Sequence, residues 1–123
     1  MMSTYLRQRL LNHVLGNDPF VQPDTVYVAL FSGDPTIAGT GPQVAVARQA
    51  STWTAPTGTS NESPNAAPLT YPGMPAGDVT HVGQYDAATG GNLLLFDPLE
   101  TPKTFAAGDT ATFAAGDLVT AFT

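Results

Sequence analysis

The stretch that decides the fold is the heptapeptide TVYVALF, Thr25 to Phe31. Its β-branched and aromatic residues favour an extended chain, and apolar side chains occupy successive rather than alternating positions. Because successive side chains of a strand point to opposite faces, this pattern predicts a central strand that is buried on both sides. The residues SGDP follow at once, and Gly33, Asp34 and Pro35 are typical of a turn that ends a strand.

Further short strands are predicted on the C-terminal side, each bounded by turn residues. Their ranges are 43–54, 69–71, 78–87, 92–96, 103–106, 110–113 and 118–122. The hexapeptide TFAAGD occurs twice, starting at Thr104 and Thr112, and this spacing suits one short strand plus one turn. Glycine supplies a positive φ in such turns, and aspartate bonds the backbone. The predicted turn residues are Gly33, Asp34, Gly77, Asp78, Gly90, Gly91, Gly108, Asp109, Gly116 and Asp117.

On the N-terminal side, the sequence predicts one helix, over residues 3–15. Ser3 is a suitable N-cap, and Gly16 is placed to end the helix in the left-handed conformation. At 100° per residue the apolar side chains cover an arc of roughly 220°, whereas a helix that rests on one sheet needs about 100°. The excess predicts a second contact, most simply with a neighbouring subunit. The predicted interface consists of Leu6, Arg7, Leu10, Leu11 and Val14.

Together these elements predict a mainly β fold. We expect a β-sandwich, or a small barrel, of about seven to eight short antiparallel strands with one N-terminal α-helix packed against it. A chain of 123 residues is the size of one domain, so we expect a single domain over 1–123, with the sandwich at 24–123.

Composition and charge exclude several classes of function. Ten acidic and four basic side chains give a net charge of −6, which disfavours a nucleic-acid partner. No run of residues is apolar enough to span a membrane, so we expect no membrane insertion. The chain has no cysteine, and this excludes disulfides and thiolate metal sites.

The chain contains no recognisable catalytic or metal-binding pattern. His13 lies on the helix and His81 in a strand, and the two aspartates that flank His81, Asp78 and Asp86, do not share its face by alternation. Most aspartates stand in turn contexts, and no GxSxG, HExxH or calcium-loop motif occurs. We therefore expect no enzyme activity, no cofactor and no metal.

Residues 55–68 form the segment most typical of a loop, polar and rich in proline. A loop of this length within a compact domain is usually a functional or contact loop. It offers an alternative function, a carbohydrate- or receptor-binding module, although core packing is the favoured role for the two flanking aromatic residues. The candidate recognition residues are Trp53, Thr57, Asn61, Glu62, Asn65 and Tyr71.

Several segments, in order, resemble a known family. These are LLNHVLG, VYVALFSGDPT, ARQA and THVGQYDAATGGNLL, followed by the paired GD turns. Together they resemble the small tail-fibre-like, or minor tail, proteins of tailed bacteriophages. Two positions depart from the resemblance: Gln84 stands where an apolar residue is expected, and Asp97-Pro98 replaces a more strand-like continuation.

The resemblance implies a non-enzymatic structural protein of the virion, made in the bacterial cytoplasm and assembled symmetrically on the particle. Its partners would be other phage proteins of the tail or capsid, further copies of itself, and a host-surface glycan or receptor. A tail-fibre or tail-appendage subunit is the first expectation. A capsid decoration protein, or head fibre, of the same particle is the alternative.

Overall fold

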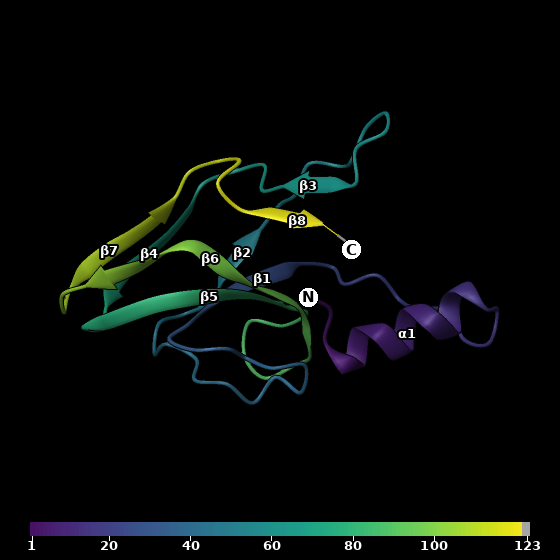
Figure 1. Cartoon of the computed structure of the whole chain (residues 1–123), viewed down its shortest axis with the longest axis horizontal. Helices are drawn as coiled ribbons and strands as arrows, with labels where there is room; N and C mark the ends of the chain where they lie inside the picture. Colours follow the sequence, from purple (N-terminus) through teal and green to yellow (C-terminus); the bar gives the residue numbers. More distant parts are fainter. Residues whose placement is uncertain (122–123) are drawn as a thin grey trace.

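The computed structural model describes residues 1–121 and contains one helix and eight strands (Figure 1). The elements in chain order are α1 (Thr4–Val14), β1 (Val26–Phe31), β2 (Gln49–Ser51), β3 (Glu62–Pro64), β4 (Leu69–Met74), β5 (Gly77–Tyr85), β6 (Leu93–Phe105), β7 (Asp109–Phe113) and β8 (Val119–Ala121). All strand pairs are antiparallel. The mainly β fold with an N-terminal helix is therefore confirmed.

The strands form three sheets. The largest has the order β2-β1-β5-β6, and the pairs β3-β8 and β4-β7 form two smaller sheets. Figure 1 shows the two pairs above the four-stranded sheet and the loop between β1 and β2 below it. Within residues 1–121 the strands do not close into a barrel. Of the two architectures expected from the sequence, the structure therefore has the layered one.

Strand β1 lies inside the four-stranded sheet and is buried on both faces, as its sequence predicts. Val28 and Leu30 belong to a core cluster on one face, and Ala29 and Phe31 belong to a second cluster on the other. Each of the four is 1% exposed. Two separate cores thus meet at one strand.

The first core lies under the two small sheets. It is made of Val28, Leu30, Leu69, Tyr71, Met74, Val79, Ala111, Phe113 and Leu118. The second core is smaller and contains Ala29, Phe31, Tyr85, Leu93 and Phe96. Gly83 makes room for the second core, because a Cβ at this position would lie 2.7 Å from Phe31 Cε2.

The strand predicted over 43–54 is wrong in length. Only Gln49–Ser51 forms a strand, with isolated bridges at Gln43 and Trp53. Val44 N–H donates to Leu30 O, but Val46 N–H donates back to Val44 O, so the chain bends locally instead of continuing along the sheet.

Two other boundaries also differ from the prediction. The segment 55–68 is not a loop throughout, because residues 62–64 form β3 and pair with β8. The separate strands predicted at 92–96 and 103–106 are one strand, β6, whose pairing with β5 shifts register between Val79 and His81. The last predicted strand ends at Ala121, and its residue 122 lies outside the described residues.

The predicted helix is confirmed, one residue shorter at each end. The Ser3 hydroxyl caps the helix by accepting from Leu6 N–H, and Gly16 has a φ of 75° after the last turn. Residues 1–3 lie beside β6: Phe96 N–H donates to Met1 O, and Ser3 N–H donates to Leu94 O. The four-stranded sheet is thereby extended at this edge, and the start of the helix is fixed to it.

Candidate assembly surface on the N-terminal helix

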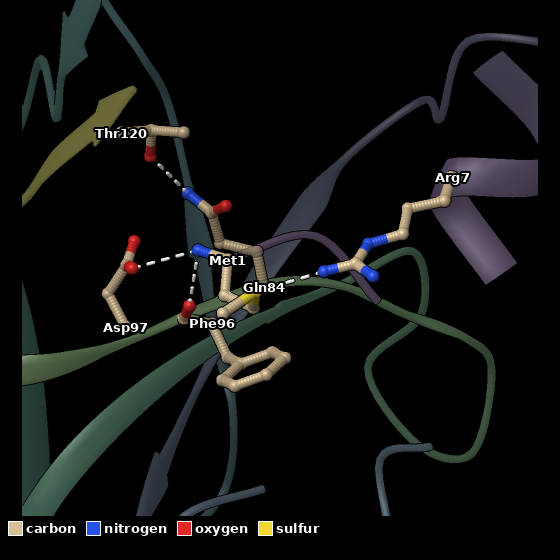
Figure 2. A network of polar contacts seen from close by, with 6 residues as sticks. All are labelled: Met1, Arg7, Gln84, Phe96, Asp97 and Thr120. Carbon is tan, nitrogen blue, oxygen red and sulfur yellow. Dashed lines mark hydrogen bonds and ion pairs between the residues drawn. The ribbon is translucent and has the colours of Figure 1, made fainter. Parts of the chain in front are cut away.

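The residue that begins the segment before the helix, Met1, is held to β6, and Arg7 of the helix contacts Met1 (Figure 2). The Met1 ammonium lies 2.8 Å from Asp97 Oδ1 and donates to Phe96 O at 2.9 Å. Arg7 Nη2 lies 3.0 Å from Met1 Sδ. The Asp97 that departs from the family resemblance therefore serves as the acidic partner of the N-terminus.

The first helical turn also docks on the body. Thr4 N–H donates to Ile37 O at 2.9 Å, and Leu6 is 4% exposed. Leu6 thus packs inside its own subunit. It was predicted as an interface residue, and its burial removes it from any surface that a partner could contact.

The second half of the helix is different, because its apolar side faces solvent. Leu11, Val14 and Leu15 are 61%, 76% and 65% exposed, and their spacing places them on one side of the helix. We call these three residues the apolar stripe. Arg7 is exposed and lies one turn before Leu11 on the same side, while Leu10 is half-buried at its edge.

On the other side of the helix, polar groups are partly buried. Tyr5, Arg9 and Asn12 are half-buried, and the Arg9 guanidinium lies 5.9 Å from the centre of the Tyr5 ring. Arg9 also pairs with Asp18 at 3.3 Å. The helix therefore places its aliphatic stripe in solvent and its mixed polar side against the rest of the subunit.

The predicted recognition residues do not form one surface. Thr57, Asn61 and Glu62 are exposed, and Trp53 is half-buried with its indole N–H donating to Ser51 Oγ. Asn65 and Tyr71 are 2% and 0% exposed. These two residues lie in the interior and cannot contact a ligand at the surface, which corrects their predicted role.

Asn65 is a structural residue that the sequence did not reveal. Its amide Nδ2 donates to Ala67 O and Ala114 O, and its Oδ1 accepts from Gly116 N–H and Leu118 N–H. The partners near residue 116 are 51 residues away. No local sequence pattern signals such a contact.

The two copies of TFAAGD form the same turn. In each copy the aspartate Oδ2 accepts from the alanine N–H three residues earlier, at 2.8 Å for Asp109 and 2.9 Å for Asp117. Gly108 and Gly116 have φ values of 88° and 86°. The repeat therefore turns the chain and presents no chemical group of its own.

The remaining predicted turn residues are less uniform. Asp34 Oδ1 accepts from Thr36 N–H after Gly33, and Gly90 and Gly91 both have positive φ in the loop between β5 and β6. Gly77 and Asp78 lie in β5 itself, so a turn at these two positions is wrong. Asp78 instead accepts from the Thr104 hydroxyl across the sheet, at 2.7 Å.

The histidines and carboxylates are dispersed. His13 Nδ1 accepts from Phe20 N–H, and His81 Nδ1 lies 2.8 Å from Thr80 Oγ1. Residues 1–121 contain no group of three or more histidine, cysteine or acidic side chains that could hold a metal. Helix α1 is also too short to cross a membrane, and the part of the chain described here has no other helix.

The described residues thus form a layered β fold with an exposed apolar stripe on its helix, and comparison with known proteins gives the class of protein, a phage fibre protein. The chain belongs to the family Gp80, described as podophage GP4 fiber I protein gp80, whose model matches residues 1–121. Comparison with curated proteins gives no match. The resemblance to phage fibre proteins is thus confirmed, and the chain is a virion component.

Proposed function

We propose that this chain is a non-enzymatic subunit of a phage tail fibre or tail appendage, and that its copies assemble chiefly through helix α1. The observation that carries the proposal is the apolar stripe of Leu11, Val14 and Leu15 on a helix that projects from the sheets (Figure 1). Burying such side chains yields about 25 cal/mol per Å² of apolar surface, so a partner that covers the stripe is stabilised.

Strand edges are secondary contacts in this proposal. The edge strand β2 is three residues long, and the exposed half of β6 contains Pro102 and Lys103. Short edges, prolines and lysines all disfavour the addition of another strand. The helix is therefore the more favourable surface for a neighbouring subunit.

Charge supports contact between copies of the chain. Helix α1 carries Arg7 and Arg9 and no acidic residue, whereas the whole chain has a net charge of −6. The helix of one copy is consequently attracted to the acidic body of another. A carbohydrate-binding role has less support, because two of its six predicted residues are buried.

Sedimentation equilibrium tests the proposal. The wild-type chain should associate reversibly, and a Leu11→Gln/Val14→Gln variant should be monomeric at the same concentrations. Ile37→Gln, which replaces another exposed apolar residue outside the stripe, should associate as the wild type does. A strictly monomeric wild type, or association that survives the double substitution, would contradict the proposal.

The position on the particle needs a separate measurement. Antibody–gold labelling of intact phage should place the chain on the tail. Labelling distributed over the head would instead make it a capsid decoration protein.

A further inference from the structure

A groove of about 650 Å³ opens between the β3-β8 pair and the four-stranded sheet. Its apolar lining includes Val26, Trp53, Leu94 and Leu95, and its exposed rim includes Ser60, Asn61 and Glu62. We call it the Trp53 groove. The hydrogen bond from Gln84 Nε2 to Thr120 Oγ1, at 2.7 Å, joins the two layers within it (Figure 2).

The surroundings of the groove are acidic. A second hollow of about 250 Å³ shares Trp53, Gln84, Leu95 and Thr120 with the groove. Together the two hollows are lined by four acidic residues, Glu62, Asp97, Glu100 and Asp117, and by no arginine, lysine or histidine among residues 1–121; Asp97 is paired with the Met1 ammonium, and the other three carboxylates make no ion pair within these residues. A ligand for this region should therefore combine apolar side chains with positive charge.

Helix α1 has this combination. The stripe supplies three aliphatic side chains, and Arg7, which is exposed one turn before Leu11 on the same side of the helix, supplies the positive charge. The other three basic residues are engaged within their own subunit: Arg9 pairs with Asp18 at 3.3 Å, the Arg48 guanidinium lies 3.6 Å from the centre of the Tyr85 ring, and Lys103 Nζ lies 4.6 Å from that of Phe113. The stripe is exposed to solvent, so it does not occupy the groove of its own subunit.

We propose that the apolar stripe of one copy lies in the Trp53 groove of the next copy, with Arg7 facing the acidic rim. This inference rests on the proposed assembly of copies through helix α1, and it names the surface that receives the helix. An amphipathic helix in an apolar groove is a common mode of protein recognition. Because the stripe and the groove are different surfaces, each copy can give one contact and receive one, which generates a ring or a filament.

Mixing two variants tests this arrangement. The stripe variant is Leu11→Gln/Val14→Gln, and the groove variant is Ser60→Arg/Asn61→Arg, which places two bulky cations at the rim that receives the basic helix. All four replaced residues are exposed, so both variants should keep the wild-type circular dichroism and urea midpoint. The matched control is Thr57→Arg/Thr59→Arg, which adds the same charge to exposed positions of the same loop outside the groove lining.

By sedimentation velocity, the wild type and the control should form species larger than a monomer, and each of the two variants alone should be monomeric. An equimolar mixture of the variants should form a dimer that grows no further. In this dimer the intact helix of the groove variant occupies the intact groove of the stripe variant, and no complete pair of surfaces remains.

The results separate this inference from the proposed function. A groove variant that associates as the wild type does, while the stripe variant does not, would overturn the groove as the receiving surface and leave assembly through the helix intact. A monomeric mixture would also overturn the head-to-tail contact. A stripe variant that still associates would overturn both proposals.

Discussion

At the scale of single residues, one buried amide holds three segments of the chain together. Asn65 makes two hydrogen bonds as a donor and two as an acceptor, to residues 67, 114, 116 and 118. These four bonds use both N–H donors and both acceptor lone pairs of the side-chain amide. The residue thus joins the start of β4 to the turn before β8.

Asn65→Ala should lower the free energy of unfolding by about 2 kcal/mol or more, because buried donors and acceptors are left without partners at about 1–3 kcal/mol each. Urea denaturation followed by circular dichroism measures the change. Asn61→Ala, at an exposed position of the same segment, should stay within about 0.5 kcal/mol of the wild type. Equal stability of the two variants would show that the Asn65 bonds do not form.

Tyr71 couples stability to pH. Its side chain is fully buried, its hydroxyl donates to Val28 O at 2.8 Å, and burial raises its pKa well above the ordinary value. Above about pH 10 the unfolded chain loses this proton while the folded chain keeps it, so stability falls as the pH rises. Below about pH 10 the stabilising contribution of the buried Tyr71 hydroxyl is fully present.

Tyr71→Phe should therefore be less stable than the wild type by about 1 kcal/mol at pH 8, through the lost hydrogen bond. The difference in the free energy of unfolding between the two proteins should become smaller above pH 10. Only the wild type has a Tyr71 hydroxyl, so only the wild type loses stability when this group is deprotonated in the unfolded chain. Urea midpoints of both proteins between pH 8 and pH 11 provide the comparison. A difference that stays constant over this range would contradict the assigned burial.

The sequence could not assign Asn65 and Tyr71 because their partners are distant in the chain. Tyr71 contacts Val28, 43 residues away, and Asn65 contacts residues about 50 away. A polar residue in a proline-rich segment is typical of an exposed loop, so the local pattern favoured the surface. The turns at Asp109 and Asp117 were predictable because their hydrogen bonds span three residues.

At the scale of elements, sequence patterns identified the buried strands better than the irregular ones. The run in β1 predicted burial on both faces, and the structure confirms it. The 43–54 prediction failed because alternation of small and polar residues does not reveal the bend made by Val44 and Val46. β3 was missed because its pairing partner, β8, lies near the other end of the chain.

The N-cap of α1 performs two functions. Ser3 Oγ accepts from Leu6 N–H and donates to Leu93 O, and both bonds are buried. Ser3→Ala should cost about 1–2 kcal/mol and increase amide hydrogen exchange across residues 4–14, since the helix loses its cap and one link to β6. Thr4→Ala, at the exposed neighbouring position, should leave the exchange rates nearly unchanged. Equal exchange in the two variants would contradict this role of Ser3.

At the scale of the whole molecule, we propose that residues 1–123 fold as a single domain. The first core joins side chains of β1 and β5 to those of β4 and β7, and it includes Leu118 directly before β8, so the three sheets should unfold together. Trp53 is the single tryptophan of the chain and lies near the β3-β8 pair. Its fluorescence and the far-ultraviolet circular dichroism should give coincident urea transitions, and separate midpoints would show that the layers unfold independently.

The orientation of the helix could be predicted only in part. The wide apolar arc indicated that one contact would not cover the helix, but it did not indicate which residues would face the body. Contacts of residues 1–4 with β6 and Ile37 settle the orientation, and these involve residues up to 96 positions away. In this orientation the apolar stripe is exposed to solvent, and the proposed assembly is based on this exposure.

The most direct measurement of this proposal is the reactivity of a thiol placed in the stripe. The chain has no cysteine, so Val14→Cys introduces a single reporter, and Thr59→Cys is the matched exposed control. In assembled protein, the Val14→Cys thiol should react with an aromatic disulfide reagent at least tenfold more slowly than the Thr59→Cys thiol, and dilution to monomers should remove the difference. Equal rates in assembled protein would show that the stripe stays exposed and would contradict assembly through helix α1.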